Sequence, residues 1–142
     1  MSISPIYTAQ ATATGGRDGS AQIADPDLTI KLAPPAAMGG DGKGNNPEQL
    51  FGAGYAACFI GAMKFAPTVD NTLPKPPADA QVAAEVGIGP RAEGGFGLTV
   101  ALAVTLPGLD RTEAERLVAT AHQICPYSNA TRGNIDVQLT VV

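Results

Sequence analysis

The segment Gly52–Ala62 constrains the fold most strongly, because it is a run of small and apolar residues without a single charge. A helix that is apolar nearly all round its surface is buried in a globular core. Glycines inside such a helix cost stability unless another backbone approaches them closely. Aromatic residues make up only 5% of the chain and tryptophan is absent. We therefore expect alanine, valine, leucine and isoleucine side chains to supply most of the packing around this helix.

The residues before this segment mark the beginning of the helix. Asn46, Pro47 and Glu48 follow the order of a helix start: a cap, a proline in the first turn and an acid near the positive end. We expect the helix to run to about Phe65. Pro67 should stop it, because proline lacks the backbone N–H that a helix interior requires.

The first fifty residues otherwise predict short strands and turns. Alternation and β-branched residues favour strands at 3–14, 20–24 and 28–32, separated by a turn at Gly15–Gly19. A loop should follow at Pro34–Gly44. Its Gly42-Lys43-Gly44 resembles part of a phosphate-binding loop, but the full motif needs Ser or Thr after the lysine, so we reject that interpretation.

The second half of the chain predicts two long strands, a second helix and a closing strand. A proline-rich connector at 71–79 leads to strands expected at 80–88 and 97–106, and 135–141 alternates as a last strand. The second helix should start near Asp110 or Thr112, with Glu113 or Glu115 completing a capping box. It should run to about Ile124 and end at Pro126. These elements predict a single α+β domain over residues 1–142, with antiparallel strands and two core helices.

Composition and charge exclude several classes of function. The formal net charge of -4 and the pI near 4.7 give no basic footprint for nucleic acid. The N-terminus has neither a cationic region nor an apolar region of the kind that signal peptides carry. No apolar stretch reaches the roughly 18 residues that a membrane span needs. We therefore expect no membrane association and a cytoplasmic protein, in which a disulfide is more often catalytic than structural.

Two cysteines, Cys58 and Cys125, carry the most distinctive chemistry. Cys58 lies in the apolar helix and Cys125 stands before Pro126, at the end of the second predicted helix. The chain has one histidine, so two thiols and one imidazole fall short of the four ligands of structural zinc, and we expect no metal site. The alternative is that each cysteine is a small buried hydrophobic residue, as most free cysteines are.

Three segments resemble the organic hydroperoxide resistance proteins, the Ohr branch of the Ohr/OsmC superfamily. They are Ala13–Gly19, the stretch from Asn46-Pro47-Glu48-Gln49-Leu50-Phe51 through Tyr55–Phe59, and Cys125–Asn134. The resemblance extends over essentially the whole chain, in the right order. Pro126-Tyr127-Ser128 after the second cysteine favours the Ohr branch over OsmC itself.

The resemblance implies a fold, a reaction and a set of site residues. The fold implied is an intertwined homodimer in which antiparallel β-sheets wrap around two central helices. Cys58 matches the peroxidatic cysteine, Cys125 the resolving one, and Arg17 and Glu48 the arginine–glutamate pair of the family. Such proteins reduce organic hydroperoxides, fatty-acid hydroperoxides among them, to alcohols. They bind no cofactor; the reductant is a dihydrolipoyl dithiol on lipoylated proteins rather than thioredoxin.

Helix geometry adds a constraint on where Arg17 and Glu48 act. Glu48 and Cys58 are separated along one straight helix by about 15 Å and by about 80° around its axis. Glu48 therefore cannot meet Cys58 of its own helix directly. Either Arg17 bridges the gap or both charged residues come from a second subunit, which the dimer implied by the resemblance favours. We expect active sites shared between two chains.

Apolar residues near the cysteines are candidates for the wall of a pocket for a lipid-like peroxide, although ordinary core packing explains each of them as well. They are Phe51, Tyr55, Phe59, Met63, Ile124 and Tyr127.

Polar neighbours of the site residues have weaker claims to a role. His122 lies one helical turn before Cys125 and could face the thiol, but a lone helical histidine is more often a structural, hydrogen-bonded residue. Asp18 could steady the arginine loop. A polar cluster after the second helix is expected to satisfy the helix end and to seat the turn; it consists of Tyr127, Ser128, Asn129 and Arg132. Other functions left open are an OsmC-like peroxidase of broader specificity, a non-enzymatic binder of hydrophobic ligands, and a redox sensor.

Overall fold

The computed structural model describes residues 2–142, which form two compact units, residues 2–50 and residues 51–142. Both units contain a three-stranded sheet, and the helices lie mainly in the second. The α+β class predicted from the sequence is confirmed. Whether the chain is one domain stays a prediction.

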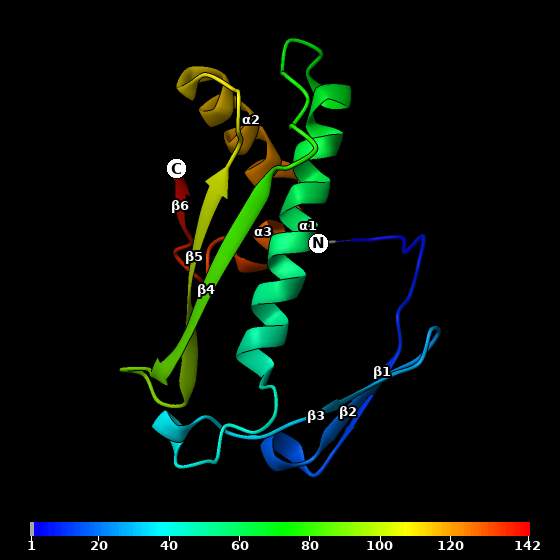
Figure 1. The fold of residues 1–142 in the computed structure, drawn as a ribbon, viewed down its shortest axis with the longest axis vertical. Coiled ribbons are helices and arrows are strands. Elements are labelled where there is room, and N and C mark those ends of the chain that lie inside the picture. Colours follow the sequence, from blue (N-terminus) through cyan, green and yellow to red (C-terminus); the bar gives the residue numbers. More distant parts are fainter. Residues whose placement is uncertain (1) are drawn as a thin grey trace. The chain divides into compact units, whose positions relative to one another are not determined.

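The first unit contains the sheet β1–β2–β3, formed by β1 (Ala11–Thr14), β2 (Ser20–Ile23) and β3 (Leu28–Lys31) in antiparallel order (Figure 1). The expected strand at 3–14 is wrong for residues 3–10, because only the four residues of β1 have partners on β2. Ile3, Ile6 and Tyr7 are exposed instead. The predicted turn is a 3₁₀ turn at Gly16–Asp18, and a Cβ at Gly19 would lie 1.8 Å from the Thr14 carbonyl oxygen.

The helix start predicted at Asn46 is confirmed. The Asn46 side chain accepts from the Gln49 backbone N–H at 2.9 Å, and the Gln49 side chain accepts from the Asn46 N–H at 3.1 Å. This reciprocal pair satisfies two N–H groups at the helix end that otherwise lack partners. Glu48 stands in the first turn, near the positive end of the helix.

Helix α1 (Pro47–Val69) is longer than predicted, because Pro67 lies inside it. Proline removes one backbone donor, but in the last turn the helix still continues through the bond from the Asp70 N–H to the Ala66 carbonyl. The glycines meet the expectation of a close backbone only in part. A Cβ at Gly52 would lie 3.3 Å from the Val86 side chain and 3.9 Å from the Ala84 carbonyl oxygen, whereas one at Gly54 would meet only the Tyr127 side chain and one at Gly61 would meet nothing within 4 Å.

Contrary to the sequence prediction, α1 is long and apolar enough to cross a membrane, with a mean hydropathy of 1.2 over 18 residues. One such helix is weak evidence for a membrane protein, because the core helix of a globular protein passes the same test. The buried face of α1, which carries Tyr55, Phe59 and Met63, belongs to the hydrophobic core.

The second sheet consists of β4 (Gln81–Pro90), β5 (Phe96–Thr105) and β6 (Gln138–Val141). β4 and β5 form an antiparallel hairpin, as the sequence predicts. β6 pairs with β5 in parallel, so the expectation of antiparallel strands throughout is wrong there. The helical segment between β5 and β6 provides the crossover that a parallel pair needs.

That segment contains two helices rather than the one predicted. α2 (Arg111–Ile124) begins at Asp110, whose side chain accepts from the Glu113 N–H at 3.0 Å. Pro126 ends α2 as expected, but it also begins α3 (Pro126–Thr131), because proline suits the first turn of a helix.

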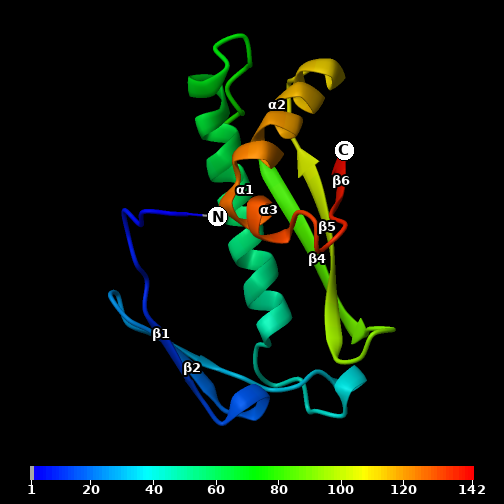
Figure 2. The same cartoon turned by 180° about the vertical axis from the view of Figure 1, so that it is seen from behind.

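In the second unit the helices lie on one face of the sheet β4–β5–β6 (Figures 1 and 2). Alternate residues of β5, Val100, Leu102 and Val104, face them and are buried. Leu117 and Ala121 of α2 are also completely buried. The core therefore lies between this face and the helices, with Cys58 on α1 and Cys125 at the junction of α2 and α3.

Candidate active site

The second unit brings the two cysteines together. The Sγ atoms of Cys58, on α1, and Cys125, between α2 and α3, lie 3.6 Å apart as free thiols. Cys125 is completely buried and Cys58 is half-buried. The pair thus has one accessible sulfur and one enclosed sulfur, an asymmetry that suits attack by Cys58 and a later reaction with Cys125.

Cys125 is held by the backbone of both helices that it joins. Its N–H donates to the Ala121 carbonyl at the end of α2, at 2.8 Å, and its carbonyl accepts from the Asn129 N–H of α3, at 2.9 Å. Arg132 donates from its guanidinium to the His122 carbonyl and to the Asn129 side chain. The expectation that this polar cluster satisfies the helix end is confirmed for Arg132.

The surroundings of Cys58 have opposing effects on its acidity. Burial raises the pKa of the Cys58 thiol above its usual value, because a thiolate loses water there. The backbone N–H of Tyr127, in the first turn of α3, acts in the other direction by hydrogen bonding to the sulfur. Sequence reasoning missed this donor, because a backbone group leaves no signal in the residue type.

The first unit pairs Arg17 with Glu48, as the family resemblance implies. The Arg17 Nη1 donates to Glu48 Oε2 at 2.9 Å and Nη2 donates to Oε1 at 2.6 Å, which makes a bidentate ion pair. The bonds from Arg17 lower the pKa of the Glu48 carboxyl and raise that of the guanidinium. Within residues 2–142, no hydrogen bond joins the Asp18 side chain to Arg17.

Three of the six pocket candidates form an aromatic cluster. The ring centroids of Phe51, Tyr55 and Tyr127 lie 5.6 to 6.1 Å apart. A Cβ at Gly54 would lie 2.9 Å from the Tyr127 hydroxyl, so this glycine lets the tyrosine lie against α1. Tyr127 is 38% exposed, whereas Tyr55 is completely buried.

The other candidates divide between core and partly buried positions. Phe59 and Met63 are completely buried in the hydrophobic core, and Ile124 packs against it. Full burial is what ordinary core residues show. The role of the six residues as a substrate pocket stays a prediction.

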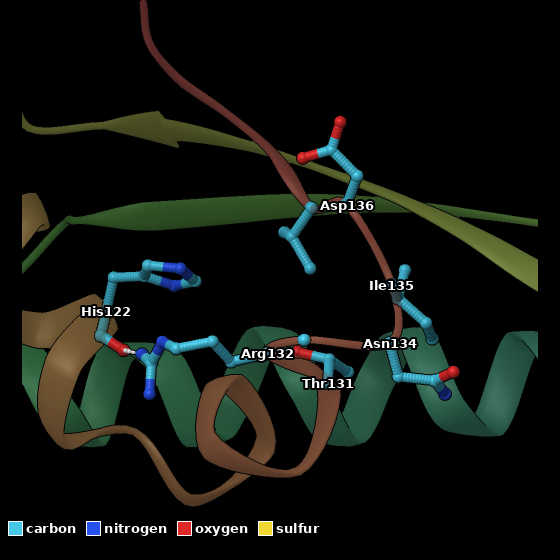
Figure 3. Close-up of a pocket in the computed structure, with 8 residues that line it drawn as sticks. His122, Thr131, Arg132, Asn134, Ile135 and Asp136 are labelled. Atoms are coloured by element: carbon cyan, nitrogen blue, oxygen red, sulfur yellow. Dashed lines mark hydrogen bonds between the residues drawn. The ribbon is translucent and has the colours of Figure 1, made fainter.

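His122 makes a hydrogen bond from Nδ1 to the Ser128 Oγ, 2.9 Å away, as a structural histidine would. Burial, and then the charge of Arg132, lower its pKa. Its ring projects into a pocket of about 380 Å³ that Arg132, Asn134 and Asp136 also line (Figure 3). Among residues 2–142, no group of three or more His, Cys, Asp or Glu side chains could hold a metal ion.

The sequence and the fold match known proteins over nearly the whole chain. Residues 40–140 match the family described as OsmC-like protein. An organic hydroperoxide resistance protein of Xanthomonas axonopodis pv. citri is 56% identical over 96% of this chain and 94% of its own length.

Two solved structures agree with the sequence matches. The crystal structure of the organic hydroperoxide resistance protein OhrB of Bacillus subtilis has a TM-score of 0.84 and 42% identity, covering 97% of this chain and all 100% of its own. That of an organic hydroperoxide resistance protein from Elizabethkingia anophelis has a TM-score of 0.88 and 44% identity, with 98% of both chains covered. The Ohr/OsmC fold expected for the single chain is confirmed, and the intertwined homodimer stays a prediction.

Proposed function

The chain belongs to the OsmC-like protein family, within it to the organic hydroperoxide resistance proteins, and we propose that it is a thiol-dependent peroxidase for organic hydroperoxides. The observation that carries the proposal is the 3.6 Å distance between the sulfur atoms of Cys58 and Cys125. Two unpaired thiols at this distance can store and release two electrons. Fatty-acid hydroperoxides are among the substrates proposed.

The cycle starts at the more accessible sulfur. The Cys58 thiolate attacks the outer peroxide oxygen; the O–O bond breaks, Cys58 becomes a sulfenic acid, and the alkoxide takes a proton to leave as an alcohol. Cys125 then condenses with the sulfenic acid to a disulfide and releases water. A dithiol of the dihydrolipoyl kind, carried on lipoylated proteins in the cytoplasm, returns both cysteines to thiols by exchange.

The raised pKa of Cys58 is the reason for proposing a cation at the site, which would favour the thiolate over the thiol. The thiolate is the nucleophile, yet burial raises the pKa of this thiol. We propose that the guanidinium of Arg17 completes the site, because it stays charged and offers several donors to the thiolate and to the alkoxide. Glu48 would fix the plane of that guanidinium through its two hydrogen bonds.

We further propose a homodimer in which one protomer supplies Arg17 and Glu48 to its partner's thiols. One face of α1 supports a second copy: Ala53, Ala57 and Gly61 are exposed and recur every four residues. Nothing lies within 4 Å of a Cβ placed at Gly61, so another helix can approach closely there. Phe65, one turn further, is 58% exposed. Such an apolar face is unusual on a monomer.

Thiol titration tests the proposal. One equivalent of cumene hydroperoxide should remove both thiols of the reduced protein rapidly, and dihydrolipoamide should restore them faster than thioredoxin does. Unchanged thiols after the peroxide would contradict the peroxidase and favour a binder of hydrophobic ligands. Equal restoration by thioredoxin would contradict the proposed reductant alone.

A further inference from the structure

A chain of buried hydroxyl groups lies beside the two sulfurs. The Tyr55 hydroxyl is 2.9 Å from the Ser128 Oγ and 3.2 Å from the Thr131 Oγ1. All three residues are at most 3% exposed. A buried hydroxyl that loses its hydrogen-bond partner destabilises the folded state, so these bonds oppose any sliding of α3 along α1.

The position of these bonds relates them directly to the thiols. Tyr55 stands three residues before Cys58 on α1, and Ser128 stands three residues after Cys125. Residues three apart on a helix lie on one face. The hydrogen bond between Tyr55 and Ser128 therefore lies in the same interface between α1 and α3 as the Cys58–Cys125 pair, about one helical turn from the two sulfurs.

The donor and acceptor of each hydrogen bond in this series of side chains can be assigned, starting from Thr131. Thr131 donates its hydroxyl proton to the Ser128 carbonyl at 3.1 Å, so it accepts from Tyr55. Because the Tyr55 hydroxyl donates its only proton to Thr131, it must accept a hydrogen bond from the Ser128 hydroxyl. Because the Ser128 proton is used in turn, the Nδ1 of His122 is the donor to Ser128. Every member is satisfied only in this direction.

His122 extends the chain to the third element at the site. His122 lies on α2, three residues before Cys125, and Ser128 lies three residues after Cys125. The carbonyl of His122 also accepts from Arg132 (Figure 3). Side-chain hydrogen bonds therefore join the elements around Cys125: His122 to Ser128 links α2 to α3, and Tyr55 to Ser128 links α1 to α3.

We propose that Tyr55, His122, Ser128 and Thr131 are positioning residues that hold Cys125 where it captures the Cys58 sulfenic acid before a second peroxide does. This inference rests on the proposed function. In the step concerned, the Cys125 sulfur attacks the Cys58 sulfur, the S–O bond breaks, and hydroxide leaves as water with the thiol proton. The competing step adds a second peroxide oxygen to give a sulfinic acid.

Matched variants isolate the hydrogen bonds from the packing. Tyr55→Phe removes one oxygen from the middle of the chain. Thr131→Val removes the acceptor while keeping the shape, and Thr131→Ser keeps the hydroxyl. His122→Leu removes the donor at the start, whereas His122→Asn keeps an N–H near the Nδ1 position. Each variant is checked for a cooperative thermal transition, and the Thr131 and His122 pairs still decide the question if Tyr55→Phe fails to fold.

The main measurement is the ratio of disulfide to sulfinic acid, read by mass spectrometry after the reduced protein meets increasing cumene hydroperoxide without reductant. Both products come from one sulfenic acid, so the ratio is independent of the first step. We expect the ratio to fall about tenfold or more in Tyr55→Phe, Thr131→Val and His122→Leu. Thr131→Ser and His122→Asn should stay near the parent protein. Parent-like ratios in all three disrupted variants would overturn the inference.

A second measurement needs no peroxidase activity. The equilibrium between the Cys58–Cys125 disulfide and dithiothreitol reports how well the two thiols are placed. It should shift toward the dithiol by about tenfold in the disrupted variants. If the parent protein consumes no peroxide but this shift occurs, the proposed function fails and the positioning stands. An unshifted equilibrium in folded variants would overturn the positioning.

Discussion

The sulfur atoms of Cys58 and Cys125 lie 3.6 Å apart with no bond between them. A disulfide requires about 2.05 Å, so the sulfurs must approach by about 1.5 Å when they join. A movement of this size lies within side-chain rotation and needs no unfolding of the helices. The reduced structure is therefore poised for disulfide formation, and the two cysteines should have separable roles.

Replacing each cysteine should separate attack from resolution. Cys58→Ser should abolish consumption of cumene hydroperoxide, because a serine hydroxyl is a far weaker nucleophile than a thiolate. Cys125→Ser should consume about one equivalent and then stall as the sulfenic acid or a higher oxide. Stopped-flow peroxide assays followed by intact-mass measurement detect both results.

The reverse pattern would assign the roles the other way. If Cys58→Ser consumed one equivalent and Cys125→Ser consumed none, Cys125 would be the attacking residue in spite of its complete burial. If Cys125→Ser turned over normally with dihydrolipoamide, no resolving cysteine would be needed.

Removing the charge of Arg17 should raise the pKa of Cys58 in the whole protein. A nearby cation favours the thiolate, whereas burial alone raises the thiol pKa. In Arg17→Ala the midpoint of the pH profile for iodoacetamide alkylation of Cys58 should therefore move to higher pH. The rate of peroxide consumption at pH 7 should fall about a hundredfold or more, since the alkoxide also loses its donors.

Two further variants distinguish charge from geometry. Arg17→Lys keeps the charge but not the fork of donors, so the alkylation midpoint should stay low while the peroxide rate falls. Glu48→Gln keeps the shape and weakens the ion pair, so it should slow the reaction less than Arg17→Ala. An alkylation midpoint that is the same in Arg17→Ala as in the parent would refute the role of the guanidinium.

Local sequence signals predicted the elements that depend on neighbouring residues. The cap at Asn46, the start of α2 at Asp110 and the hairpin β4–β5 are all close to their predicted bounds. Such features are set by side chains within a few positions, so one sequence is enough to read them. The bidentate pair of Arg17 and Glu48 came instead from family resemblance, because these residues are far apart in the chain.

What the sequence could not show depends on contacts over longer distances. The direction of β6 depends on the path through α2 and α3, and the four alternating residues of β6 fit either direction equally well. Pro67 stays helical because it falls in the last turn, which no local rule distinguishes from a stop. The hydrogen bond between Tyr55 and Ser128 joins two unremarkable residues, and only the packing of α1 against α3 brings them together.

A charge on the exposed face of α1 should prevent dimer formation. Ala57 is exposed in one chain, but the proposed dimer would bury it, where an unpaired carboxylate is very costly. Ala57→Glu should therefore shift the mass measured by light scattering from two chains to one chain of 14.4 kDa. Ala119→Glu makes the same change on the exposed side of α2 and should leave the dimer intact. A dimeric and active Ala57→Glu protein would contradict this interface.

The lowered pKa of His122 should make the protein less stable as the solution is acidified. Burial and the charge of Arg132 hold this pKa below its usual 6.5, so below pH 6.5 the unfolded chain binds a proton that the native state does not. The free energy of unfolding should therefore fall between pH 7.5 and 5.5. Glu48 and Asp70, whose pKa values are lowered from 4.5 and 3.8, contribute mainly below this range.

His122→Asn tests this assignment, because it removes the titrating ring and keeps a donor for Ser128. Urea unfolding at pH 7.5, 6.5 and 5.5 should show a flatter dependence on pH in this variant than in the parent protein. Glu93→Gln is the control, because it replaces an unrelated surface carboxylate. It should show the same dependence of the unfolding free energy on pH as the parent protein. If His122→Asn retains that slope too, another group takes up the proton on unfolding.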